Sequence, residues 1–172
     1  MKTKAIEAVR MLNDFVGDLV AGTRSLELFE SPDFASKIGA NTQLILRRMC
    51  LSHLVVTLSK WAELYDRYKA AIPDATRETC LSLRKEIEAR SIRDFRNTVV
   101  GHIWDSKLGR PLRRSEVDTR LASVLRGDQQ AFLAWINSPS DNVFPKTVVA
   151  ICEATREAIR VEHGLGDSEI FT

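Results

Sequence analysis

The chain has 172 residues, of which 44% are hydrophobic and 28% are charged, and its formal net charge is +2. This length suffices for one domain with a substantial core, and the composition is ordinary for a globular protein. The near-neutral balance does not by itself mark a nucleic-acid binder. No stretch of about 18 uninterrupted apolar residues exists, so the sequence predicts no membrane span.

The cysteines argue against disulfides and zinc. Cys50, Cys80 and Cys152 are far apart and odd in number, and no Cys-x-x-Cys pair or Cys/His cluster has zinc spacing. Reduced thiols in or near the core are typical of cytoplasmic proteins. The first residues, MKTKAIEAVRMLNDF, carry charges where a signal peptide stays apolar. We therefore expect a cytoplasmic protein without a metal site or cofactor.

The first predicted helix covers about residues 3–28. Its apolar stripe is formed by Ile6, Val9, Leu12, Phe15, Val16, Leu19 and Val20. Gly17 and Gly22 interrupt the pattern and indicate either close packing or an early end. A break follows at Ser31-Pro32-Asp33, where Ser or Asp is placed as a cap, and residues 34–38 have room for one further turn.

The second predicted helix covers about residues 41–68, with Asn41 as its N-cap. Its broad apolar side is formed by Leu44, Ile45, Met49, Leu51, Leu54, Val55, Leu58, Trp61, Leu64 and Tyr65. His53 lies beside this stripe and is interpreted as a structural or surface histidine. Ile72-Pro73 ends the helix, and Asp74 is a reasonable cap for the next one.

The third helix is predicted over about residues 75–90, with a kink or short break at Ser91. Ser91 and Asp94 resemble a capping box in which Asp replaces Glu. The helix that follows, residues 91–105, carries the most distinctive residues of the chain. A loop is expected at 107–111, where Gly and Pro gather.

The remaining helices are shorter. Ser115 is expected to cap a helix that runs to Arg126 and closes at Gly127, and Asp128 to cap one that runs to about residue 136. A loop covers 137–142. Pro145 then opens the last helix, which ends near His163 at Gly164, and residues 165–172 are expected to be a loose tail.

No segment shows the alternation of apolar and polar residues that is typical of a β-strand, so the predicted fold class is all-α. We expect residues 1–172 to form a single-domain helical bundle, with a four-helix core plus short extra helices.

The segment SIRDFRNTVVGHIWD, residues 91–105, combines an apolar face with polar residues at its edges. The apolar face is formed by Ile92, Phe95, Val99 and Ile103. On an α-helix, Arg96 and His102 would lie on opposite edges of this stripe, about 120° apart and about 9 Å along the axis. Arginine is a forked cation that holds phosphate oxygens, and histidine moves protons near neutral pH. A site for phosphodiester chemistry could use these residues, but the residues alone favour a packing helix with polar flanks.

Positive charge gathers around this segment. From Arg84 to Arg114 there are nine basic and four acidic residues, and nine minus four leaves +5. The basic residues are Arg84, Lys85, Arg90, Arg93, Arg96, Lys107, Arg110, Arg113 and Arg114. Such a field would attract RNA phosphates, and Arg93, Lys107 and Arg110 are the candidate substrate-binding residues. The alternative is a solvated helix face followed by a basic loop.

The run RNTVVGH, residues 96–102, resembles the R-x(4–6)-H motif of the HEPN superfamily (higher eukaryotes and prokaryotes nucleotide-binding domains). In that family a polar residue follows the arginine, as Asn97 does here, and the Val-Gly-His-Ile run is similar to the abortive-infection branch. The resemblance implies a metal-independent endoribonuclease of the toxin–antitoxin or phage-defence type. It assigns His102 to proton transfer, Arg96 to the phosphoryl charge and Asn97 to positioning.

The resemblance also implies a homodimer that joins two motifs in one cleft, and a possible antitoxin partner protein. The chain departs from some toxin members at Trp104, where they carry a modifiable tyrosine two positions after the histidine. Asp105, three after His102, either orients the imidazole or is solvated at the helix end. The alternative function is a non-catalytic helical module that binds a nucleic acid or a protein.

Overall fold

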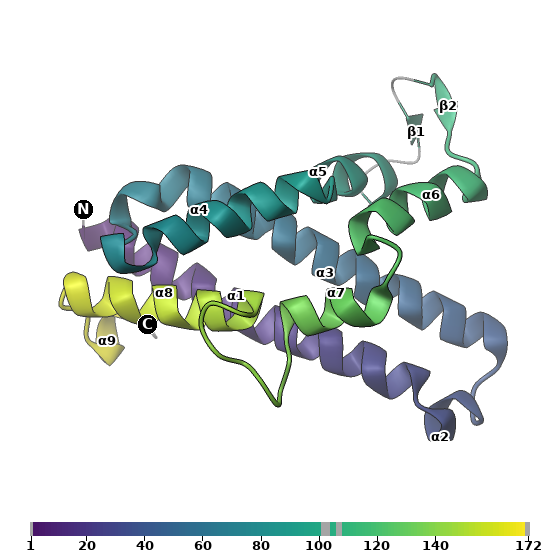
Figure 1. Cartoon of the computed structure of the whole chain (residues 1–172), viewed down its shortest axis with the longest axis horizontal. Helices are drawn as coiled ribbons and strands as arrows, with labels where there is room; N and C mark the ends of the chain where they lie inside the picture. The colour runs from purple at the N-terminus through teal and green to yellow at the C-terminus, as the bar shows by residue number, and fades with distance from the viewer. Residues whose placement is uncertain (1, 101–103, 106–107, 171–172) are drawn as a thin grey trace.

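Two long helices, α1 (Lys2–Glu30) and α3 (Ala40–Tyr68), lie side by side along most of the length of the molecule (Figure 1). The helix α4 (Asp74–Ala89) packs on α3, and α8 (Val148–Glu162) packs on both α1 and α4. These four helices form the core of an all-α bundle, so the predicted fold class is confirmed.

In the computed structural model, the residues described are 2–100, 104–105 and 108–170. The shorter elements within them are α2 (Pro32–Ala35), the 3₁₀ turn η1 (Lys69–Ala71), α5 (Ile92–Phe95), the π-helical turn η2 (Arg96–Val100), β1 (Trp104–Asp105), β2 (Arg110–Pro111), α6 (Arg114–Leu125), α7 (Gln129–Ile136) and α9 (Asp167–Ile170). The strands pair antiparallel, with Trp104 opposite Pro111 and Asp105 opposite Arg110. This small ladder was not predicted, because two-residue strands leave no alternating pattern.

The predicted apolar stripes of α1 and of the second half of α3 face each other in the core. Leu12, Leu19 and Leu54 are completely buried. At Gly22 the two helices approach so closely that an added Cβ would lie 2.7 Å from Cδ2 of Leu54. Gly22 therefore marks close packing, one of the two alternatives the sequence offered, whereas nothing lies within 4 Å of the corresponding position at Gly17.

The first half of α3 departs from the prediction. Leu44, Ile45 and Met49 were expected on the apolar side of the bundle, yet they are 42%, 49% and 60% exposed. The periodic pattern of α3 continues through both of its halves. The apolar side chains of the second half of α3 are buried in the core, whereas those of Leu44, Ile45 and Met49 in the first half are exposed.

Two predicted helix caps are confirmed. The side chain of Ser31 accepts a hydrogen bond from the backbone of Phe34 at the start of α2. Asp128 accepts one from the backbone of Ala131 over 2.9 Å at the start of α7. Both side chains satisfy backbone donors that a helix leaves open in its first turn.

Four other predicted helix starts are wrong by one to three residues. The caps are Gly39 rather than Asn41 for α3, Pro73 rather than Asp74 for α4, and Arg113 rather than Ser115 for α6. The last helix begins at Val148 instead of Pro145, because the side chain of Thr147 accepts a hydrogen bond from the backbone of Ala150 over 3.1 Å.

The expectation of a loose tail is wrong for residues 165–170. Leu165 and Ile170 are buried, and α9 is folded against α1. Arg10 of α1 donates hydrogen bonds to the backbone oxygens of Ile170 over 3.0 Å and Glu169 over 2.9 Å. The predicted end of the preceding helix is confirmed, since His163 is its C-cap and Gly164 has a φ of +57°.

No helix of the described residues is both long enough and apolar enough to cross a membrane.

Candidate functional site

The helical conformation is interrupted at Ser91, between α4 and α5. Ser91 adopts a left-handed conformation with a φ of 56°, so the predicted break at this residue is confirmed. The predicted capping box is wrong, because in this conformation the side chain of Ser91 forms no cap hydrogen bond with α5. A new short helix, α5, starts at Ile92.

The sequence predicted that the motif segment is one α-helix, and this prediction is wrong. After one turn of α5, the backbone widens at Arg96 into the π-helical turn η2, which ends at Val100. Ile92 and Phe95 are buried, and Val99 packs partly against the core, so this part of the predicted apolar face is confirmed. Because π-helical turns are rare and are frequently found at functional sites, the widening at Arg96 singles out this part of the segment.

Several motif residues lie outside the part of the chain that the structure describes. They are Gly101, His102 and Ile103. The candidate substrate-binding residue Lys107, which follows the motif segment, also lies outside the described residues. The predicted angular separation of Arg96 and His102 assumed a continuous α-helix, which the described backbone does not form.

Arg96 is held by its neighbour at the start of η2. Its Nη1 donates to Oδ1 of Asn97 over 2.9 Å. The Arg96 side chain is half-buried and Asn97 is exposed, and Arg96 forms no ion pair with any residue in the described ranges. One donor of the guanidinium is therefore used for orientation, while its charge is not balanced by a described carboxylate.

Two of the three candidate substrate-binding residues already hold carboxylates. Arg93 lies 3.5 Å from Asp66 of α3, and Arg110 pairs with Glu116 over 2.6 Å. The Arg110 pair is bidentate, which lowers the pKa of Glu116 from 4.5 to about 2 and raises the pKa of Arg110. Because Asp66 and Glu116 lie outside residues 84–114, part of the +5 counted along the sequence is neutralised in space.

Arg90, counted among the basic residues of the cluster, is a core residue. It is only 8% exposed, donates to Glu86 over 2.8 Å and to the backbone oxygen of Val124 over 3.1 Å, and lies 4.4 Å from the ring centre of Trp135. Arg90 thus ties α4 to α6 and α7. It is not available to a substrate.

Asp105 is buried, so the solvated alternative for this residue is wrong. It is 2% exposed, and its Oδ2 accepts a hydrogen bond from Nη2 of Arg120 in α6 over 2.8 Å. Its Oδ1 accepts the backbone N–H of Leu108 over 2.9 Å. The second terminal nitrogen of Arg120, Nη1, is buried and finds no acceptor among the described residues. The pair fixes the chain directly beyond the motif.

No pattern in the sequence indicated a role for Arg120. It lies 15 positions after Asp105, beyond a turn and a two-residue ladder, so no helical spacing connects the two residues. Only the return of the chain through the β1–β2 turn brings them together.

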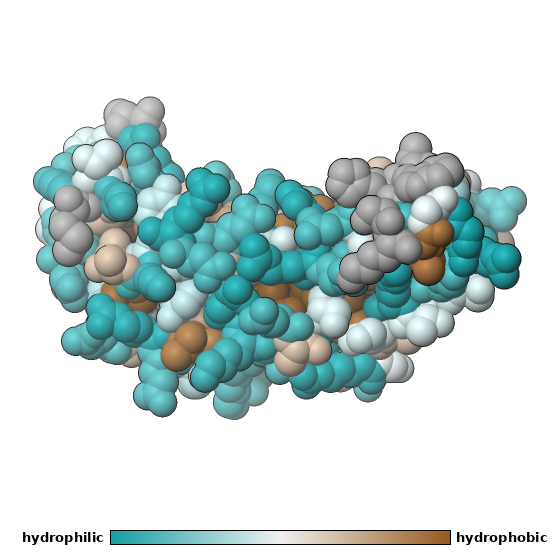
Figure 2. Space-filling model, turned by 90° about the horizontal axis from the view of Figure 1, so that it is seen from above, coloured by the Kyte–Doolittle hydropathy of each residue, from teal (hydrophilic) through white to brown (hydrophobic). Residues whose placement is uncertain are grey.

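The face that carries α4, α5 and the β1–β2 ladder is hydrophilic over most of its described area (Figure 2). The exposed residues of α4 and α6 are mainly charged or polar, as in Lys85, Glu88, Arg114 and Asp118. Both signs of charge are present, and this fits the pairing of the basic residues described above.

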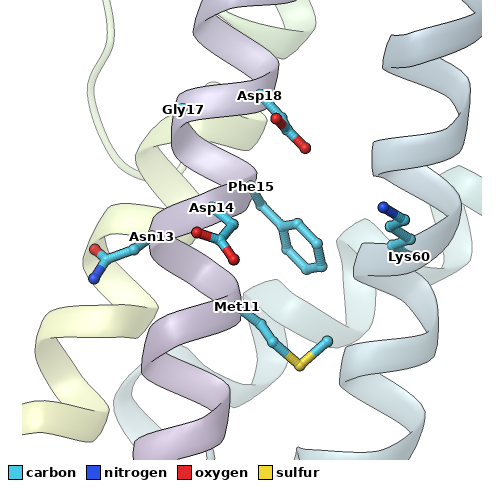
Figure 3. A pocket seen from close by; sticks show the side chains of 7 residues that line it. All are labelled: Met11, Asn13, Asp14, Phe15, Gly17, Asp18 and Lys60. Carbon is cyan, nitrogen blue, oxygen red and sulfur yellow. The ribbon is translucent and has the colours of Figure 1, made fainter. Parts of the chain in front are cut away.

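A groove of about 760 Å³ lies between α1 and α3, away from the motif (Figure 3). The side chains of Phe15 and Asp18 extend from α1 toward the side of Lys60 of α3, Asp14 lies in front of α1, and Met11 lies at one end. No described residue of the motif lines this groove.

His53, interpreted from the sequence as a structural or surface residue, lies on α3 beside Asp18. Its Nε2 is 3.2 Å from the backbone oxygen of Asp18 and 3.7 Å from the Asp18 carboxylate. The described chain contains no group of three or more His, Cys, Asp or Glu side chains that could hold a metal ion. His53 therefore acts as a tether between α1 and α3.

The chain was compared with known proteins. No family model and no curated protein matches it. Among solved structures, it is similar to Vpc_cass2, an integron cassette protein from the mobile metagenome of V. paracholerae. The TM-score is 0.74 at 25% sequence identity, and the match covers 92% of this chain and 97% of that protein. The likeness therefore extends over nearly the whole bundle.

Proposed function

We propose that the protein is a metal-independent endoribonuclease of the HEPN type. The observation that carries the proposal is the arrangement of Arg96 and Asn97 at the first turn of η2. Unlike Arg93 and Arg110, Arg96 forms no ion pair with a described residue, and Asn97 orients its guanidinium. A preorganised, forked cation is suited to the charge that develops on a phosphoryl group.

In the proposed reaction, the 2′-hydroxyl oxygen of RNA attacks the adjacent phosphorus, and the bond from phosphorus to the 5′-oxygen breaks. The products are a 2′,3′-cyclic phosphate and a 5′-hydroxyl. Arg96 stabilises the non-bridging oxygens, Asn97 positions the guanidinium or the phosphate, and His102 transfers a proton.

One histidine cannot at the same moment accept the proton of the 2′-hydroxyl and donate one to the leaving oxygen. A homodimer that brings two copies of His102 and Arg96 into one cleft supplies both groups. The proposal therefore includes a homodimer, and an antitoxin protein is the partner expected for an enzyme of this type.

The test is cleavage of total RNA and tRNA in excess EDTA, with end-group analysis for the 2′,3′-cyclic phosphate. His102→Ala should lower the rate by about 10²–10⁴-fold, the usual contribution of a general acid or base. Arg96→Lys should also be severely impaired, because a point charge does not replace a planar fork.

Arg77→Lys is the matched control for Arg96→Lys, since Arg77 pairs with Asp74 at the start of α4 and lies outside the basic stretch 84–114. It should retain most of the activity. The proposal is wrong if the wild-type protein cleaves none of these RNAs, or if His102→Ala cleaves as fast as wild type. RNA binding without turnover, unchanged in His102→Ala, would identify the protein as the non-catalytic binding module instead.

A further inference from the structure

A small pocket of about 120 Å³ lies where α1, α8 and α9 meet (Figure 1). Its described lining consists of Val9 and Asn13 of α1, Arg156 and Arg160 of α8, and Ile170 of α9. No described residue of the motif segment is among them. The pocket is therefore separate from the candidate site for RNA.

Arg156 is a cation without a described carboxylate partner. Its Nη1 donates to Oδ1 of Asn13 over 2.8 Å, and it forms no ion pair with a residue in the described ranges. Glu153, one turn earlier on α8, accepts a hydrogen bond from Asn142 over 3.4 Å instead. The half-buried guanidinium is thus oriented by a neutral amide, which leaves its charge uncompensated.

Arg160 lies one turn beyond Arg156 and is only loosely paired. Its guanidinium is 3.6 Å from Glu157 and 3.6 Å from Asp167, and both distances exceed those of good hydrogen bonds. The two carboxylates are 54% and 72% exposed, and exposed pairs of this kind contribute little to stability. The donors of Arg160 can therefore turn to a stronger acceptor.

The other charged groups near the pocket are engaged elsewhere. Glu169 pairs with Lys2 over 2.7 Å and accepts the backbone N–H of Gly166 over 3.1 Å. Arg10 holds the backbone of α9 and adds positive charge to this corner. Asp14 is exposed and lines the groove between α1 and α3. None of these carboxylates pairs with Arg156.

The polar groups that line the pocket are donors. Because Oδ1 of Asn13 accepts from Arg156, its Nδ2 is left to donate, and it has no acceptor among the described residues. Val9 and Ile170 add apolar walls, since they are only 1% and 5% exposed. Two guanidinium groups from one helix and an amide from another approach a ligand from different directions. Tetrahedral phosphate oxygens suit such donors better than a planar carboxylate does.

The volume limits the ligand to one small group. A single water needs about 10–15 Å³ of such space, and pockets for drug-sized ligands have about 300–1,000 Å³. With about 120 Å³, the pocket has room for a phosphate group, and anything attached to that group must extend into solvent.

We propose that this pocket binds a phosphate group, either as inorganic phosphate or as the terminal phosphate of a small molecule. Arg156 and Arg160 hold its oxygens by charge-assisted hydrogen bonds, and Nδ2 of Asn13 donates a third. The bound group balances the charge of Arg156 and links α1 to α8. This inference goes beyond the proposed function, because neither RNA nor the motif segment takes part.

Isothermal titration calorimetry of the full chain, at constant ionic strength, tests the proposal with inorganic phosphate, glycerol 3-phosphate and acetate. Wild type should bind one inorganic phosphate per chain with a Kd below about 1 mM, and acetate at least about tenfold more weakly. Glycerol 3-phosphate distinguishes the two sources: similar affinity supports a terminal phosphate as ligand, and much weaker binding supports the free ion.

Asn13→Asp is the most specific variant. The new carboxylate still accepts the hydrogen bond from Arg156, so the circular dichroism spectrum should not change, but its charge repels phosphate. It should raise the phosphate Kd at least about tenfold, as should Arg156→Met and Arg160→Met. Arg24→Met is the matched control, because Arg24 is a 58% exposed arginine of α1 outside the pocket; the Kd should stay unchanged.

Thermal unfolding gives a second measurement, because a ligand of the native state raises the melting temperature. At a phosphate concentration of ten times the Kd, wild type should gain about 3–6 °C more than Asn13→Asp does. The general stabilising effect of phosphate salts is present in both proteins and cancels.

The proposal is overturned if calorimetry detects no saturable phosphate binding up to about 10 mM, a range that corresponds to very weak affinity. It is also overturned if Asn13→Asp binds phosphate as tightly as wild type, or if acetate binds as tightly as phosphate. None of these measurements involves RNA cleavage, so this proposal and the proposed function fail separately.

Discussion

Arg120 and Asp105 form a nearly buried ion pair that holds the end of the motif segment against α6. The distance from Nη2 to Oδ2 is 2.8 Å, and only 1% of the Asp105 side chain is exposed, against 28% for Arg120. A carboxylate in such a place depends on its partner, because desolvation disfavours its charged form unless hydrogen bonds compensate.

Removing the cation should therefore destabilise the fold. Arg120→Met keeps most of the side-chain volume but removes the 2.8 Å hydrogen bond from Arg120 to the Asp105 carboxylate. We expect the free energy of unfolding to fall by about 3 kcal/mol, measured by urea denaturation. The exposed Arg114→Met is the control and should change it by less than about 0.5 kcal/mol.

The double variant Arg120→Met/Asp105→Asn should recover a large part of this loss, because it no longer buries a carboxylate whose bond to Arg120 has been removed. If the double variant is less stable than Arg120→Met alone, the charge pair is not the cause of the effect.

Arg90 should contribute to stability rather than to RNA binding. Arg90→Met removes the hydrogen bonds to Glu86 and Val124 and the contact with the Trp135 ring. We expect a loss of about 2–3 kcal/mol, which corresponds to a fall in melting temperature of roughly 4–12 °C. Arg93→Met, at a half-exposed position, should lower the melting temperature far less. Equal effects of the two changes would contradict a core role for Arg90.

Gly17 and Gly22 should respond in opposite ways to the same substitution. Both lie in α1, where alanine is favoured over glycine by about 1 kcal/mol. Gly17→Ala should realise this gain, since nothing lies within 4 Å of the new methyl group. At Gly22 the methyl group would push the buried Leu54 out of place, so Gly22→Ala should destabilise the fold by about 1 kcal/mol or more. Thermal unfolding of the two variants measures the difference directly.

Ser91 should tolerate glycine better than any β-branched residue. Its φ of 56° costs a non-glycine residue about 1–2 kcal/mol, so Ser91→Gly should leave stability unchanged or raise it, whereas Ser91→Val should lower it. Asp94→Asn should have almost no effect, since no capping box links the two residues. A clear loss in Asp94→Asn would show that the cap forms in solution.

The Arg110–Glu116 pair predicts a defined pH dependence. The pKa of Glu116 is lowered from 4.5 to about 2 in the folded chain, mainly by the hydrogen bonds from Arg110. The unfolded chain therefore binds more protons between these values, so the pair stabilises the fold above pH 4.5 and loses this effect as the pH falls toward 2. In Glu116→Gln, the decrease in melting temperature over this interval should be smaller than in wild type. Identical pH profiles would contradict the pairing.

Periodicity alone predicted the helices of the core and the residues buried between them, because burial of an apolar stripe follows directly from helical spacing. Leu12, Leu19 and Leu54 are examples. The same rule failed at Leu44, Ile45 and Met49, since a pattern on one helix does not reveal whether another element covers it.

The backbone conformation of the motif segment could not be predicted from the spacing of its apolar residues. The π-helical turn at Arg96 changes the hydrogen-bond register without changing the apolar spacing of Ile92, Phe95 and Val99. The charge count failed for a related reason. The carboxylates that neutralise Arg93 and Arg110 are those of Asp66 in α3 and Glu116 in α6, and both lie outside the counted residues 84–114.

The contact between α1 and α8 has a consequence for synthesis on the ribosome. α8 begins at Val148, 118 positions after α1 ends at Glu30 (148 minus 30). Residues of α1 such as Val9 therefore remain without their final cover while most of the nascent chain emerges. During this interval the uncovered stripe is a binding site for chaperones and a starting point for aggregation, so yield in the cell should depend on how quickly α8 follows.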